Sequence, residues 1–164
     1  MILAKVELKQ PVVEEIKENI KDAKSVVLVD YRGLTVEQDT KLRKMLREEG
    51  VFYKVYKNTM VKFAIDGTEF DSLKADLEEP TAVVVSKTDA TAPARLVAKF
   101  AKDAPILEMK AGVVEGTYYD AEGIKAISAV PSRDELISKF LGSIQSPIAN
   151  FARVIKQIAE AKEA

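Results

Sequence analysis

The sequence predicts an α/β (α+β) protein: a globular domain with a central sheet of about four strands flanked by helices, followed by a long amphipathic helix. Two observations support this. Over residues 1–130, segments with helical periodicity alternate with short β-rich apolar runs, which is typical of a sheet covered by helices. Over residues 131–164, apolar residues recur at seven-residue spacing, which is typical of one long helix with a single apolar face.

The first half of the globular domain is expected to hold two helices and two strands. Apolar residues at helical spacing predict a helix over 11–21, and an apolar run predicts a buried strand over 26–29. After a turn at 31–34, Thr35 and Gln38 have the spacing of a capping box, which predicts a helix running to Gly50. The strand expected over 51–56 alternates, so two faces are predicted: Val51, Tyr53 and Val55 on one, and Phe52, Lys54 and Tyr56 on the other.

The second half continues the alternation of helices and strands. The expected elements, in order, are a short helix over 60–65 capped by Asn58 or Thr59, a helix over 69–79, a strand over 81–85, a helix over 91–102 with Pro93 in its first turn, a strand over 107–114 before a turn at 115–116, and a helix over 120–129.

The C-terminal segment has a clear start and an interruption. Ser132 and Glu135 form a second capping box after Pro131, and Pro147 predicts a kinked or divided helix with blocks at 132–146 and 147–162. A straight helix of this length would run roughly 50 Å, beyond the roughly 30 Å width of a small domain, so much of the apolar face needs a partner. That face consists of Ile137, Phe140, Leu141, Ile144, Ile148, Phe151, Val154, Ile155 and Ile158.

Three alternatives remain for this apolar face. It could fold back on its own core, it could pair with further copies of the chain as a coiled coil, or it could lie on a membrane. Pro147 and the scarcity of charged flanking pairs argue against the coiled coil, and few lysines and arginines flank the stripe for membrane binding. We therefore expect two similar docking surfaces in series for a partner, in a chain that is not a homo-oligomer.

Composition excludes several function classes. The 164 residues contain no cysteine and no histidine, which removes disulfides, thiol nucleophiles, most zinc sites and the commonest general base. No segment resembles a membrane span, and Lys5, Glu7 and Lys9 interrupt the N-terminus where a signal peptide needs an apolar stretch. We expect a cytoplasmic protein that is not an enzyme and uses no cofactor or metal.

The strongest candidate site lies at two predicted strand ends. Arg32-Gly33 follows the first strand and Lys57-Asn58-Thr59 follows the second, and both loops would meet at one edge if these strands run parallel in one sheet. A helix N-terminus with a lysine and a glycine suits phosphate groups. The helix that follows Thr35 could add Arg43, Lys44 and Arg47 as contacts to a nucleic-acid backbone.

Charge supports this placement, although simpler explanations exist. Residues 1–62 carry a net charge of +3 and residues 63–131 a net charge of −5. Gly33 could simply make a turn, Asn58 could simply cap a helix, and the basic residues could simply be solvated. A small phosphate-binding enzyme using Lys57 and Asp30 is a further alternative, but no base or metal cluster accompanies them.

The chain resembles the bacterial stalk base protein of the large ribosomal subunit, the L-ten (uL10) family, over its whole length. The matching blocks, in this order, are 29–35 (VDYRGLT), Leu42-Arg43 with Leu46-Arg47, 55–60 (VYKNTM), 79–83 (EPTAV), 110–112 (KAG) and 131–136 (PSRDEL). Their combined order and spacing are specific, whereas the KNT tripeptide alone would be weak.

The resemblance implies a division of labour between two regions. Residues 1–130 would bind large-subunit 23S rRNA beside an L11-type ribosomal protein, and residues 131–164 would form a helical spine for dimers of an L7/L12-type stalk protein, which recruit translation GTPases. Two blocks leave room for two dimers. The rRNA-facing motifs of the family match Arg32, Gly33, Lys57, Asn58 and Thr59, with Arg43, Arg47 and Lys62 as weaker candidates, and the apolar stripe from Ile137 to Ile158 falls in the dimer-docking helix.

Overall fold

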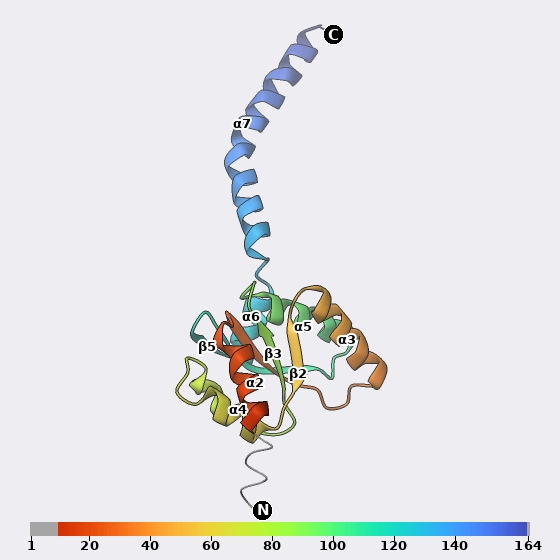
Figure 1. The fold of residues 1–164 in the computed structure, drawn as a ribbon. Helices are drawn as coiled ribbons and strands as arrows, with labels where there is room; N and C mark the ends of the chain where they lie inside the picture. The colour runs from red at the N-terminus through yellow and green to blue at the C-terminus, as the bar shows by residue number, and fades with distance from the viewer. Residues whose placement is uncertain (1–9, 164) are drawn as a thin grey trace, which may run out of the picture. The chain divides into compact units, whose positions relative to one another are not determined.

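The chain forms two compact units, residues 1–130 and residues 131–164, drawn in Figure 1. The structure is a computed structural model that describes the backbone of residues 10–163 and the side chains of residues 10–158. The N-terminal segment 1–9, where the sequence predicts no signal peptide, lies outside the described residues.

The first unit is built on a five-stranded sheet with the order β2-β3-β1-β4-β5, and every neighbouring pair is antiparallel. The α/β class is confirmed, with one strand more than the four expected. The elements are α2 (Gln10–Lys21), β1 (Ser25–Asp30), α3 (Val36–Glu48), β2 (Phe52–Val55), α4 (Asn58–Ile65), the 3-10 helix η1 (Asp71–Lys74), β3 (Ala82–Ser86), α5 (Ala92–Asp103), β4 (Glu108–Val114), β5 (Thr117–Asp120) and α6 (Ala121–Ser128).

Helices cover both faces of this sheet (Figure 1), and an apolar core lies on each face. Helices α3, α5 and α6 bury residues such as Leu42, Val97 and Ile124 against one face, and α2, α4 and η1 cover the other. The central strands supply both cores by alternation, as Val27 and Val29 face one side and Val26 and Leu28 the other. The two faces expected for residues 51–56 are likewise confirmed, because Val51 packs in the first core and Tyr56 in the second.

The helix expected over 69–79 is wrong: only the short 3-10 helix η1 forms there. Phe70 and Leu73 are buried three residues apart, and the N–H of Leu73 donates to the carbonyl of Phe70. The N–H groups of Asp71 and Asp76 likewise donate to the carbonyls of Thr68 and Leu73. Each of these bonds spans three residues, as in a 3-10 helix, so the segment forms successive tight turns and not the α-helix expected from its sequence.

The fifth strand, β5, was not expected from the sequence. Glu115 and Gly116 both have positive φ, 50° and 77°, which is the backbone of a tight hairpin between β4 and β5. β5 lies at the edge of the sheet and is mostly exposed. An edge strand with little buried surface has no strong apolar alternation in its sequence, so this strand gave no signal.

The second unit consists of one helix, α7 (Arg133–Glu163), with Pro147 inside it. The predicted cap is present, since Ser132 Oγ accepts a bond from the N–H of Glu135 at 3.3 Å. The alternative that Pro147 divides the segment is not realised. The helix instead continues through Pro147 and changes direction near its middle (Figure 1), as expected when a proline removes one intrahelical hydrogen bond.

Candidate functional site

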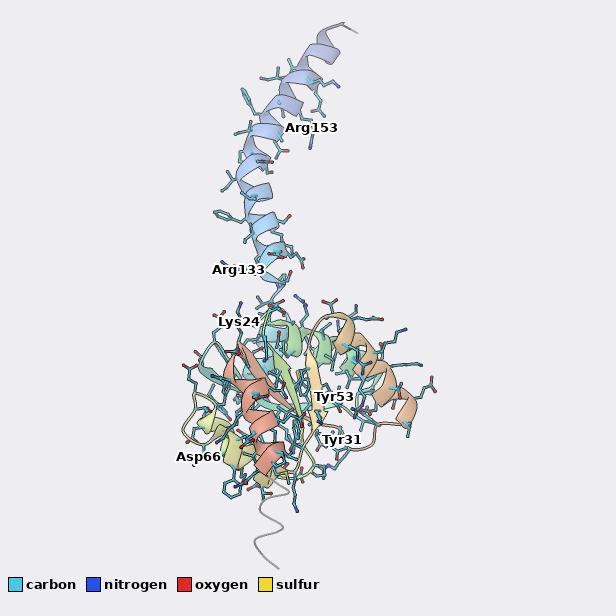
Figure 2. All side chains as sticks on the ribbon, in the orientation of Figure 1. Lys24, Tyr31, Tyr53, Asp66, Arg133 and Arg153 are labelled. Carbon is cyan, nitrogen blue, oxygen red and sulfur yellow. The ribbon has the colours of Figure 1, made fainter. Side chains whose placement is uncertain are left out.

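Three segments meet at one end of the sheet. Val29 of β1 and Val55 of β2 both pair with Ala82 of β3, so the ends of β1 and β2 lie on either side of the start of β3. We call the surface formed by residues 30–34, 56–59 and 78–81 the loop edge. In Figure 2, Tyr31 lies at this end of the sheet and Lys24 at the other. The two predicted motif loops thus share one edge because β1 and β2 run in the same direction, although β3 separates them.

Helix α4 opens toward the loop edge without a side-chain cap. Its N-cap residue is Lys57, whose side chain makes no capping bond, so the expected capping by Asn58 or Thr59 is wrong. The carbonyl of Lys57 accepts bonds from the N–H groups of Met60 and Val61, at 2.8 and 3.2 Å. The first N–H groups of a helix have no intrahelical partner, which leaves those of Asn58 and Thr59 available to an anion.

The Asn58 side chain joins two segments of the loop edge instead. Its Nδ2 donates to the carbonyl oxygen of Glu79 at 2.6 Å. Lys57 is exposed and forms no ion pair with any described residue. An open hollow of about 400 Å³ lies between these segments. Its lining consists of Tyr31, Val55, Tyr56, Lys57, Asn58, Thr59, Glu79, Pro80 and Thr81.

Arg32 is held in place by two carboxylates. Its Nε and Nη2 donate to Asp30 Oδ2 at 2.9 and 2.7 Å, and Nη2 also reaches Glu79 Oε2 at 2.5 Å. Burial alone would raise the pKa of Asp30, but hydrogen bonds from the side chain and backbone N–H of Arg32 outweigh it and lower that pKa. The hydrogen bond to Asp30 in turn raises the pKa of Arg32. These bonds therefore fix the orientation of the Arg32 guanidinium before any ligand binds.

Gly33 completes the turn after β1 with a positive φ of 83°. A Cβ at this position would lie 2.6 Å from Cγ2 of Ile106. Glycine is required here both by the backbone conformation and by the close neighbour.

Two residues not predicted as site residues also take part here: Glu79, which lies in the loop edge, and Lys110, which β4 places beside it. The register of β1 and β4 shifts between Leu28 and Val29, which leaves Lys110 as the extra residue of a β-bulge, a feature that re-aims side chains. Its Nζ donates to the carbonyl of Glu78 at 2.8 Å and lies 3.6 Å from Glu79 Oε2. Both residues occur in blocks that resemble the family, but their convergence depends on the strand order, which the sequence does not reveal.

The remaining rRNA candidates lie farther from the loop edge. Arg43 pairs with Asp39 at 2.7 Å and lies over the Tyr53 ring at 5.0 Å from its centre. Arg47 is exposed near the far end of α3, roughly 16 Å along the axis from Val36. Lys62 is half-buried, one turn into α4. The structure brings Arg32, Gly33, Lys57, Asn58 and Thr59 together at the loop edge. Arg43, Arg47 and Lys62 lie outside it, along α3 and α4.

The apolar stripe of α7 is exposed along its whole predicted length. Its exposed fractions run from 47% at Ile137 to 73% at Ile148. In Figure 2, side chains stand out from α7 between Arg133 and Arg153. The other members of the stripe are Phe140, Leu141, Ile144, Phe151, Val154, Ile155 and Ile158. Contiguous exposed apolar surface of this kind is typical of sites where proteins interact.

The described residues contain neither of two other kinds of site. No group of three or more acidic side chains that could hold a metal ion is found among them. No helix in the described part of the chain is long and apolar enough to cross a bilayer.

The comparisons with known proteins agree with this organisation. The sequence model of the family described as Ribosomal protein L10 matches residues 4–102, and the model described as Ribosomal protein uL10 C-terminal region matches residues 130–164. These two matches fall on the globular unit and on the segment that contains α7.

Individual relatives match over nearly the full length of both chains. The large ribosomal subunit protein uL10 of Alkaliphilus metalliredigens is 49% identical over 96% of this chain and 95% of its own. Those of Clostridium tetani and Staphylococcus carnosus are 47% and 46% identical, over 96% of this chain and 91% and 95% of their own. The chain therefore belongs to the ribosomal protein L10 (uL10) family of the large ribosomal subunit.

Proposed function

We propose that this chain is the base of the ribosomal stalk: a non-catalytic scaffold that joins 23S rRNA to two dimers of an L7/L12-type stalk protein. The observation that carries the proposal is the presence, in one chain, of two surfaces of different chemistry. One is the loop edge with exposed Lys57, and the other is the exposed apolar stripe of α7. An L11-type protein would lie nearby on the ribosome, and translation GTPases would be recruited indirectly through the stalk dimers.

The loop edge suits the backbone of RNA. Lys57 supplies a positive charge, the start of α4 supplies N–H groups without a side-chain cap, and the open hollow gives phosphate oxygens access to both. Contacts of this kind position a protein on a nucleic acid and carry no sequence information by themselves. Arg43, Arg47 and Lys62 lie outside the loop edge and should contribute less.

The stripe of α7 suits helical partners. Pro147 separates Phe140, Leu141 and Ile144 from Phe151, Val154 and Ile155, so each half offers a similar group of bulky side chains. Burying nine such side chains at roughly 1.5 kcal/mol each gives on the order of 10 kcal/mol as an upper bound. Association costs about 4–15 kcal/mol, so stable binding requires most of each half.

The rRNA contact is tested by replacing Lys57 with Glu. The variant should bind 23S rRNA about tenfold to a hundredfold more weakly, because a phosphate contact becomes a repulsion. The matched control is Lys125→Glu, which makes the same charge change at an exposed position on α6, outside the loop edge. Filter binding at several salt concentrations measures both. Equal affinities for the two variants would remove the loop edge from the proposal.

The stalk contact is tested by replacing Phe151 with Asp, which should halve the number of bound stalk dimers by removing the second block. Ala149→Asp is the control, because it adds the same charge two residues away, off the apolar stripe. Native mass spectrometry with purified stalk protein counts the dimers. Two dimers on the Phe151 variant would mean that the blocks are misplaced, and a stable oligomer of the chain alone, sealed through α7, would favour the coiled-coil alternative.

A further inference from the structure

The charges of the loop edge largely cancel one another. With Lys110 included, the basic residues are Arg32, Lys57 and Lys110, and the acidic residues are Asp30, Glu78 and Glu79. A surface with no net charge offers a polyanion little long-range attraction. RNA can therefore bind at this edge only if some carboxylates move away from the basic side chains, and the next question is which carboxylate moves.

Asp30 and Glu79 hold Arg32 in different ways. The Asp30 side chain is 12% exposed and accepts bonds from both the backbone N–H and the guanidinium of Arg32. The Glu79 side chain is 54% exposed and reaches Arg32 through one oxygen, Oε2, which also lies 3.6 Å from Nζ of Lys110. Asp30 is the buried anchor of the guanidinium, and its Oδ2 also lies 4.0 Å from Nζ of Lys110. Glu79 is a second, solvent-exposed anion between the same two cations.

The backbone of Glu79 is unusual for a residue that has a side chain. Its φ is +57°, a conformation that glycine adopts easily and that L-residues rarely adopt. The turn itself is used, because the carbonyls of Glu78 and Glu79 accept bonds from Lys110 and Asn58. Glycine would support these backbone bonds equally well. The glutamate side chain therefore adds one thing at this position, a carboxylate between Arg32 and Lys110.

We propose that the Glu79 carboxylate occupies, in the free chain, the place that an RNA phosphate takes between Arg32 and Lys110. RNA binding then exchanges one anion for another, and Asp30 keeps the guanidinium oriented during the exchange. Glu79 lowers the affinity for RNA in general and makes binding depend on further contacts such as Lys57. The inference rests on the proposed binding of rRNA at the loop edge.

The test compares Glu79→Gln with Glu78→Gln. Both remove one negative charge from the same turn, but the Glu78 side chain is exposed and forms no ion pair with any described residue. Glu79→Gln should bind 23S rRNA about two- to fivefold more tightly than Glu78→Gln, the range expected when an exposed ion pair no longer competes. The difference should shrink as salt is raised. Glu79→Gly, which suits the positive φ, should behave as Glu79→Gln does.

The outcomes separate this inference from the proposed function. If Lys57→Glu weakens binding in the same assay while neither Glu79 variant binds more tightly than Glu78→Gln, the rRNA site stands and the role of Glu79 is overturned. Weaker binding by both Glu79 variants would assign Glu79 to positioning Arg32 and would also overturn the competition. Absence of binding by the wild-type chain would overturn both proposals.

Discussion

In the loop edge most charged groups already have partners within the chain, whereas in α7 the apolar side chains stand exposed. Arg32 is bound by Asp30 and Glu79, and Lys110 by the carbonyl of Glu78, while every member of the α7 stripe is at least 47% exposed. The first surface is ordered before any ligand arrives, so under the proposed function it must exchange contacts when RNA binds. The second has few contacts to lose, and under the proposed function its burial would come from the stalk protein.

The globular unit that carries the loop edge and the helix α7 should differ in how much stability the loss of a leucine side chain removes. Leu28 is 0% exposed and Leu141 is 52% exposed. Leu28→Ala should lower the free energy of unfolding of the globular unit by about 2–5 kcal/mol, because it leaves a cavity in the core. Leu141→Ala should change it by less than about 0.5 kcal/mol. Chemical denaturation followed by circular dichroism measures both, and equal losses would mean that α7 packs as a core helix does.

Replacing a glycine by alanine should destabilise the globular unit but stabilise α7, with smaller changes in free energy than the leucine substitution in the core. Gly33→Ala should destabilise the globular unit by about 1–2 kcal/mol, because it forces an L-residue into a positive φ and brings its Cβ close to Ile106. Gly142 lies inside α7 with open space around the position of a Cβ. Gly142→Ala should therefore stabilise the helical state of α7 by about 1 kcal/mol. Its helix content should rise accordingly. Thermal unfolding gives the first value and far-ultraviolet circular dichroism the second. Stabilisation by Gly33→Ala would contradict the assigned turn.

The smallest effect should be the pH dependence contributed by Asp30. Its pKa is lowered in the folded chain despite burial, by the bonds from Arg32, so its stabilising contribution is present above the unfolded pKa of about 3.9 and is lost as pH falls through the lower folded value. Asp30→Asn should therefore flatten the loss of stability in acid below about pH 4. Urea titrations at a series of pH values measure this. An unchanged acid profile would mean that the Arg32 contact does not form in solution.

Local signals in the sequence predicted much of this fold. The capping boxes at Thr35 and Ser132 give the starts of α3 and α7, and the bonds from Gln38 and Glu135 to these caps are present. The alternation over 51–56 gives both faces of β2. These features depend only on residues close together in the chain, so a periodic pattern suffices to find them.

Features that depend on distant partners were missed. The convergence of Glu79 and Lys110 on Arg32 requires β3 to lie between β1 and β2, and it requires the β-bulge in β4. Asn58 does not cap α4, because Lys57 is the N-cap residue and the Asn58 side chain donates to the carbonyl of Glu79. The motif loops were found from residue types, but the ion pairs that restrain them come from tertiary structure.

The central claim, that one chain joins rRNA to the stalk dimers, is tested most directly by cosedimentation. Labelled stalk protein and 23S rRNA are centrifuged together with and without the wild-type chain, and the label that travels with the rRNA is counted. The account predicts two stalk dimers per rRNA when the chain is present and none when it is absent. Stalk protein that stays behind in the presence of rRNA-bound chain would contradict it.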